Sequence, residues 1–192
     1  MKKLFQFLIT ISLILSAFGW TQAQSLKLNT LESNIRWYGE EITGKTHFGN
    51  LSFKEAQIVV QEGFIINGNF VVNMSSLTVE DISGRGKEKL EGNLKSDNFF
   101  SVEKHPEATL KITKNKKVDG NVQTLYGELT IKGIKHSVNF TITLGDNKTA
   151  VAQLTFDRSK YNVRFRSGSF FDNLGDKLIL DDIMMEVSLK WN

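Results

Sequence analysis

Strict alternation of apolar and polar residues is the main feature of the chain. From Phe64 to Met74 the even positions are apolar or glycine, whereas asparagine recurs at the odd positions. Alternation with a period of two is typical of a β-strand that buries one face. The same pattern returns in the stretches 107–113, 125–132, 137–144, 150–157 and 183–191. We predict a strand in each of these stretches.

The stretch before Phe64 is less regular, and we predict three strands in it. They run through residues 35–39, 47–53 and 56–60, where alternate positions are mostly apolar or small. Short turns rich in glycine, asparagine and aspartate separate the predicted strands, so neighbouring strands should pair in antiparallel fashion. About eight strands in roughly 170 residues suit a closed antiparallel β-barrel, because closure leaves no exposed strand edge. The predicted fold class is therefore all-β.

One connection interrupts the succession of strands and turns. Residues 74–107 show no alternation, and a structureless loop of that length is unusual inside a compact domain. Residues 87–95 fit a short helix with Leu90 and Leu94 on one face. We therefore predict a lid or plug with a short helix near residues 77–100, lying across one end of the barrel.

Alternation shows that one face is apolar, but it leaves open where that face points. A soluble barrel turns its apolar face inward, whereas an outer-membrane barrel turns it outward to lipid around a polar lumen. Here the polar face is charged and rich in threonine, and phenylalanines lie in the middle of the strands rather than in two girdles. These features favour the inward arrangement and leave a small outer-membrane barrel as the alternative.

The N-terminus has the layout of a secretory signal peptide. Two lysines precede an apolar run from Leu4 to Phe18, and the small residue Ala23 follows a few positions later. We predict a signal peptide at residues 1–23 and a single β-barrel domain at residues 24–192. The protein should then be exported, to the periplasm or the medium, and be soluble after cleavage.

Charge and cysteine content exclude several classes of function. Without the two lysines of the signal peptide, 22 basic residues face 21 acidic ones, and no concentrated basic stripe suggests nucleic-acid binding. Cysteine is absent, which excludes disulfides, thiolate metal sites and thiol nucleophiles. The three histidines, His47, His105 and His136, are not at metal-ligand spacings. We therefore expect no metal site and no cofactor.

Five stretches in a defined order resemble one protein family. They are Lys45–Gly49, Leu90–Phe100, His105–Ala108, Gly127–Gly133 and Asp157–Val163. Together they resemble the YceI-like family over roughly residues 27–191. The resemblance implies an exported, lipocalin-like antiparallel barrel that holds a polyisoprenoid or similar lipid in an elongated apolar cavity. Residues 164–177 depart from the family pattern, which leaves the shape of one cavity mouth undefined.

On this interpretation, alternation selects the side chains that line the cavity and contact the ligand. They are Trp37, His47, Phe53, Phe64, Phe70, Leu129, Phe140, Ala152, Phe156 and Met185. Small residues at inward positions should leave room for a lipid tail: Gly39, Gly68, Gly127 and Ala152. His47 shares its face with Leu51 and Phe53, so it needs a partner, either a hydroxyl group from a neighbouring strand or a ligand head group.

Three arginines near the end of the chain are candidates for head-group contacts. Arg158, Arg164 and Arg166 could grip a phosphate or pyrophosphate at the barrel mouth. Phe165, Phe170 and Phe171 could close over the tail.

The predicted function is binding, and sequestration or transport, of a long apolar lipid of polyisoprenoid or isoprenoid-quinone type. Burial of the tail favours binding by about 0.8 kcal/mol per CH₂ group, so no catalytic group is needed. Two alternatives stay open: the outer-membrane barrel, and a lipid-acting enzyme with His47 as its general base. Transient membrane contact and a homodimer also remain open.

Overall fold

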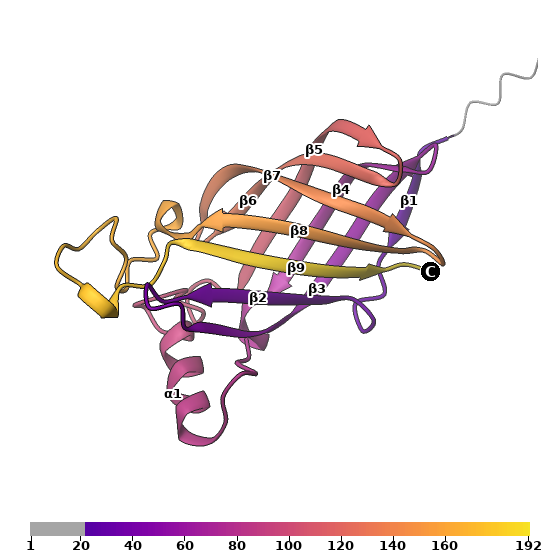
Figure 1. Ribbon diagram of the computed structural model, residues 1–192. Helices are drawn as coiled ribbons and strands as arrows, with labels where there is room; N and C mark the ends of the chain where they lie inside the picture. Colours follow the sequence, from indigo (N-terminus) through magenta and orange to yellow (C-terminus); the bar gives the residue numbers. More distant parts are fainter. Residues whose placement is uncertain (1–21) are drawn as a thin grey trace, which may run out of the picture.

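The computed structural model describes residues 22–192, and in that part the chain is mostly β-strand (Figure 1). The strands are β1 (Gln24–Lys27), β2 (Asn34–Glu40), β3 (Thr46–Gln61), β4 (Phe64–Asn73), β5 (Glu107–Asp119), β6 (Val122–Ile131), β7 (Ile134–Gly145), β8 (Thr149–Asp157) and β9 (Asp182–Lys190). Helix α1 spans Gly84–Lys95, and short 3₁₀ helices span Met74–Ser76, Arg158–Tyr161 and Gly175–Lys177. The expected signal peptide, residues 1–23, lies outside the described residues except for its last two positions.

Eight strands close into an antiparallel barrel in the order β3-β2-β9-β8-β7-β6-β5-β4, and pairing of β3 with β4 completes the ring. The short β1 pairs with the second half of β3, beside the edge that β2 occupies along the first half. The prediction of a closed antiparallel barrel of about eight strands is confirmed.

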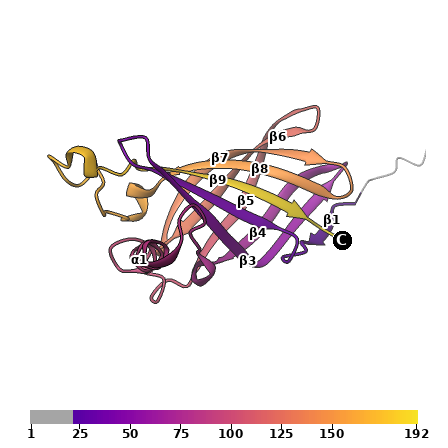
Figure 2. The same cartoon turned by 60° about the horizontal axis from the view of Figure 1, so that its bottom comes forward.

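We call the end where β2, β4, β6 and β8 finish the mouth, and the opposite end the base. Figures 1 and 2 both show α1 at the mouth and β1 with the C-terminus at the base.

Strand β3 corrects the prediction of two separate strands at 47–53 and 56–60. It runs without a break for 16 residues, but its register against β4 shifts between Phe53 and Glu55. The extra residue, Lys54, forms a β-bulge, so Phe53 and Ala56 are both buried although they are three positions apart. A bulge interrupts the period of two in the sequence, which makes one bent strand resemble two.

A second bulge corrects the assignment of Phe64 to the cavity. Val59 pairs with Asn67 and Val60 with Ile65, so Ile66 is the extra residue in β4. A one-residue slip exchanges the two faces of a strand. Before the bulge it is Ile65 that is fully buried, whereas Phe64 is only partly buried.

The base is filled by side chains. Ile58, Ile65 and Leu125 are fully buried there, together with the polar Gln123. Gln123 Oε1 accepts a hydrogen bond from the Ile65 N–H at 2.9 Å, and Gln123 Nε2 donates to the Ile65 carbonyl at 3.0 Å. Pairing of β4 with β5 runs only from Gly68 to Asn73, so the glutamine supplies the partners that the diverging strand leaves missing.

The predicted helical lid is confirmed, and its helix begins three residues earlier than expected. Leu90 and Leu94 turn toward the barrel core, and Leu94 is buried. Glu91 pairs with Lys87 at 3.7 Å and accepts a hydrogen bond from the Val79 N–H at 2.8 Å. That second bond ties the helix to residues 77–81, which we call the strap.

The strap continues the sheet along β3 beyond the point where β4 ends. Thr78 N–H donates to the Asn50 carbonyl at 3.0 Å, and the Thr78 carbonyl accepts from Trp37 Nε1 at 3.0 Å. Gly49 makes this approach feasible, because a Cβ atom at that position would lie 1.7 Å from the Thr78 carbonyl oxygen. The strap can therefore lie against β3 only because residue 49 is a glycine.

We predict that Gly49→Ala destabilises the protein by about 1–3 kcal/mol, the usual cost of forcing extra volume into a packed site. The matched control is Gly92→Ala in α1, where an added Cβ meets no atom within 4 Å. Alanine favours a helix over glycine by about 1 kcal/mol, so the control should be neutral or stabilising. Urea unfolding of both variants tests this, and equal stabilities would contradict the role of Gly49.

Candidate functional site

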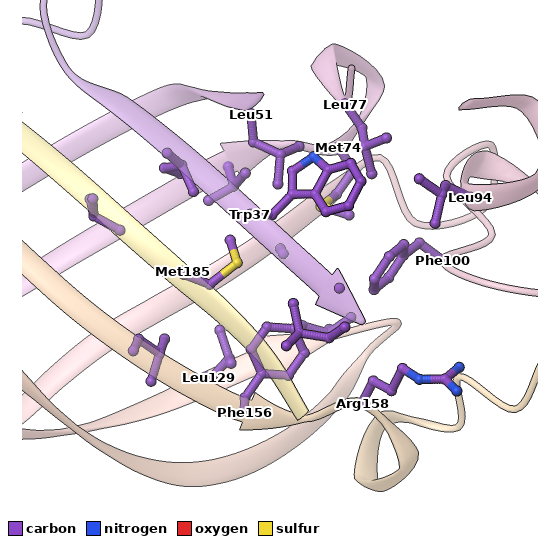
Figure 3. A pocket seen from close by; sticks show the side chains of 18 of the residues that line it. Trp37, Leu51, Met74, Leu77, Leu94, Phe100, Leu129, Phe156, Arg158 and Met185 are labelled. Atoms are coloured by element: carbon purple, nitrogen blue, oxygen red, sulfur yellow. The ribbon is translucent and has the colours of Figure 1, made fainter. Parts of the chain in front are cut away.

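An apolar cavity of about 230 Å³ lies inside the barrel (Figure 3). All eight barrel strands contribute to its wall, and α1, the strap and the segment 158–179 add to it. The fully buried residues of the base, such as Ile58 and Leu125, do not line it. At the other end its lining includes Glu40 and Arg166, both exposed. The cavity is therefore closed at the base and open at the mouth.

Most of the side chains expected in the cavity do line it. They are Trp37, His47, Phe53, Phe70, Leu129, Phe140, Ala152, Phe156 and Met185. Phe64 does not, because of the bulge at Ile66. The apolar face of the barrel thus points inward, which is the reverse of the arrangement in outer-membrane barrels.

Two of the four small inward residues do not open space for a tail. Gly39 and Ala152 line the cavity, but Gly68 and Gly127 do not. A Cβ at Gly68 would meet side-chain atoms of Phe70 and Ile112 at 3.0 and 3.1 Å, and one at Gly127 would meet the Lys111 carbonyl at 2.9 Å. Neighbouring groups have already taken the space that these glycines leave.

The roof of the cavity comes from segments that show no alternation, so the strand pattern did not reveal it. Leu77, Leu94 and Phe100 reach in from the lid, and Figure 3 shows Leu94 and Phe100 facing the barrel across the mouth. Phe99 meets Phe165 with ring centroids 5.2 Å apart, which joins the lid to the segment after β8. Phe165 closes over the cavity as expected, whereas Phe170 and Phe171 do not line it.

His47 lines the cavity, and its partner is an acid rather than a hydroxyl group. Its Nδ1 lies 2.7 Å from Asp81 Oδ2 in the strap, and its Nε2 lies 4.0 Å from Glu41 Oε1. The Phe48 N–H donates to the other Asp81 oxygen at 3.0 Å. Desolvation acts to raise the pKa of Asp81, but the hydrogen bonds from Phe48 and His47 outweigh it and hold that pKa below its ordinary value. Asp81 therefore holds the strap against the start of β3, and we call its contacts with His47 and Phe48 the latch.

Arg158, one of the three arginines expected to contact a head group, is bonded mainly within the protein. Its side chain is fully buried and donates to the backbone carbonyls of Val163, Phe165, Ile179 and Leu180 at 3.0–3.3 Å. Its Nη2 also lies 3.1 Å from Asp181 Oδ1. Burial lowers the pKa of the guanidinium, and the charges of Asp181 and Asp157 oppose that shift. Arg158 also lines the cavity, but its N–H donors are used within the protein, where they hold the segment 158–181 together.

The other two arginines lie at the surface of the mouth. Arg166 lines the cavity and also a second, more open groove, whereas Arg164 lines the groove alone. In the described part of the chain no helix is long and apolar enough to cross a membrane. Among residues 22–192, no three histidine or carboxylate side chains are grouped so that they could hold a metal ion.

We predict that Asp81→Asn lowers the free energy of unfolding at pH 7 by about 1.5–3 kcal/mol, the usual value of hydrogen bonds to a charged group. Because the folded-state pKa of Asp81 is depressed, its contribution is complete above the unfolded value near 3.8 and is lost as the pH falls through the folded value. The gap between wild type and variant should therefore shrink below about pH 4. Urea unfolding from pH 7 to pH 3 measures it, with the exposed Asp172→Asn as control; a gap independent of pH would contradict the latch.

Arg158→Gln should cost about 3–5 kcal/mol of stability, because it removes the charge that pairs with Asp181 and leaves several buried backbone carbonyls without their donor. Arg85→Gln removes an exposed arginine in α1 and should change stability by less than about 0.5 kcal/mol. Thermal and urea unfolding of the two variants give the comparison. Equal stabilities would show that the buried network does not support the mouth.

Solved structures of several proteins share this fold. BcnA of Burkholderia cenocepacia is 17% identical, with a TM-score of 0.64 and coverage of 84% of this chain and 98% of that one. A polyisoprenoid binding domain from Saccharophagus degradans, implicated in plant cell wall breakdown, is 10% identical, with a TM-score of 0.56 and coverage of 89% and 99%. The YceI protein of Campylobacter jejuni is 19% identical, with a TM-score of 0.54 and coverage of 73% and 82%.

Comparison with curated protein sequences gives no match. A sequence model of the YceI-like domain matches residues 26–191, which is nearly all of the described chain. The matched stretch holds the eight-stranded barrel, the lid and the apolar cavity. On this evidence the chain belongs to the YceI-like family.

Proposed function

We propose that the protein binds and carries a long apolar lipid, of polyisoprenoid or isoprenoid-quinone type, and does not transform it. The observation that carries this proposal is the apolar cavity, closed by packed side chains at the base and open at the mouth. The structural similarity to a polyisoprenoid binding domain from Saccharophagus degradans supports it. The family match supports lipid binding in the same way.

The energetics of such a ligand suit the site. Each CH₂ group removed from water contributes about 0.8 kcal/mol, so a long tail gains much from an apolar lining without any directional bond. The walls are held by strands paired on both sides, so the cavity exists before the ligand arrives. The lid and the segment 158–181 both lie at the mouth, where a ligand would pass (Figure 2).

The alternative of an enzyme with His47 as general base has less support. A base needs its free nitrogen directed at a nucleophile or a reacting proton. Here Asp81 occupies one side of the ring, and the other nitrogen faces the carboxylate of Glu41. The pair of His47 and Asp81 instead joins the strap to β3, which is a structural role.

Export is part of the same proposal. The predicted signal peptide would deliver the chain to the periplasm or the medium, where the cleaved protein would be soluble and would hold the lipid away from water. We expect the protein to contact a membrane transiently when it takes up or releases the lipid, because exposure of the whole apolar tail to water is unfavourable.

Ala152→Phe tests whether the cavity holds a lipid. Ala152 lines the cavity, and a phenylalanine there should occupy the space that a tail needs. We expect near-normal thermal stability, because filling a cavity costs little, together with loss of co-purifying lipid. Gentle extraction of the purified protein followed by mass spectrometry detects the lipid.

The matched control is Val151→Phe, on the same strand but with a side chain 50% exposed on the outer face. It should retain the lipid. If Ala152→Phe also retains the lipid, or if the wild-type protein yields none under the same extraction, the cavity is not the binding site that we propose.

A further inference from the structure

A second groove, of about 460 Å³, lies at the mouth outside the barrel cavity. It lies between the turn after α1 and the segment after β8. Its lining includes Asp97, Asn98, Lys132, Asn162, Arg164, Phe165, Arg166, Phe171 and Leu174. Phe165 and Arg166 line the cavity as well, so these two residues form a wall shared by both hollows.

The charge in this groove is positive and is not neutralised within it. Its one carboxylate, Asp97, already pairs with Lys104 at 2.5 Å. Lys132 donates to the carbonyls of Phe99 and Asn162, which holds its ammonium group in place. In the described part of the chain, neither Arg164 nor Arg166 forms an ion pair or a side-chain hydrogen bond.

Both free guanidiniums are nevertheless held in position. Arg164 stacks on the ring of Phe170 at 4.5 Å, and Arg166 on the ring of Phe165 at 5.1 Å. Stacking on an aromatic ring orients a guanidinium while its N–H groups stay available. Such a fork is suited to a phosphate group, which it can bind through two parallel hydrogen bonds.

The backbone under the two arginines is constrained by the buried network. Arg158 holds the Phe165 carbonyl, and Asp181 accepts hydrogen bonds from the hydroxyls of Ser167 and Ser169 at 2.8 and 2.7 Å. The Arg166 carbonyl also accepts a hydrogen bond from the Ile179 N–H at 2.9 Å. These contacts fix the backbone from which both arginine side chains project.

We propose that this groove binds a phosphate-type anionic head group of an amphiphile whose tail occupies the barrel cavity. This inference rests on the proposed function, because the tail must enter the cavity for the head to meet the groove. The tail would pass beside Phe165, and Arg164 with Arg166 would hold the phosphate oxygens. The ligand class is therefore an anionic lipid of the prenyl phosphate type rather than a neutral one.

The test compares two probes that share one tail, farnesol and farnesyl phosphate, by calorimetric titration of the mature, delipidated protein. The wild type should bind the phosphate at least about tenfold more tightly than the alcohol, because charge-assisted hydrogen bonds add to the same tail contacts. In Arg164→Gln, which removes an arginine that lines the groove but not the cavity, that advantage should fall severalfold, while affinity for farnesol is unchanged. Arg85→Gln, which removes an arginine from α1, should keep the advantage.

Farnesol binding by Arg164→Gln shows that this variant is folded, so the comparison holds even if its melting temperature falls. Equal affinities of the wild type for the two probes would overturn the inference and leave the proposed function intact. Failure of the wild type to bind either probe would overturn the proposed function itself. A third arm uses inorganic phosphate: if it binds as tightly as farnesyl phosphate, the groove is a site for free phosphate and the inference fails.

Discussion

The structure depends on the pairing of β3 along both of its edges. A strand of 16 residues exposes N–H and carbonyl groups on two sides, and buried groups of this kind need partners. On one edge β2 and β1 supply them in succession. On the other edge β4 leaves at Asn73, and the strap takes over at Asn50 and Phe48. The requirement for backbone partners therefore draws the lid over the mouth and makes the hollow beneath it a cavity.

The mouth is assembled from two segments that lack regular alternation, and polar groups hold both. Asp81 latches the strap, and the buried Arg158 with Asp181 organises the segment after β8. The two meet where Phe99 packs against Phe165, and Arg158 lies 5.6 Å from the Phe99 ring. Burying an arginine is costly, and the four carbonyl contacts and the carboxylate offset that cost. Such a network favours one defined structure of the mouth, because its groups find all of their partners in only one arrangement of the chain.

Affinity and selectivity come from different parts of such a site. The apolar wall binds any tail of suitable width with an energy that grows with buried area. Discrimination among lipids must then arise at the mouth, where polar side chains are available. His47, Glu41 and the arginines gather there, while the base holds only packed side chains and the saturated Gln123.

The sequence by itself indicated most of the barrel strands, the closure of the barrel, the side chains that share its apolar face and the helix of the lid. Period-two alternation carries that information because successive side chains of a strand point to opposite faces. Prediction from alternation failed where a bulge shifted the pattern, and where the partner of a polar side chain lies far away in the sequence. The bulge at Lys54 made the single strand β3 look like two strands in the sequence, and the bulge at Ile66 removed Phe64 from the cavity.

Only the tertiary structure decided which polar side chains are paired within the protein and which remain available to a ligand. Asp81 lies 34 positions from His47, and Asp181 lies 23 positions from Arg158, so no local pattern relates them. Closure of the barrel brings these pairs together, while the guanidiniums of Arg164 and Arg166 stay at the surface, stacked on the rings of Phe170 and Phe165. Three arginines of similar appearance in the sequence therefore divide into one that supports the mouth and two that face a groove. The physical reason is burial: a guanidinium removed from water must find its partners within the protein, and one at the surface need not.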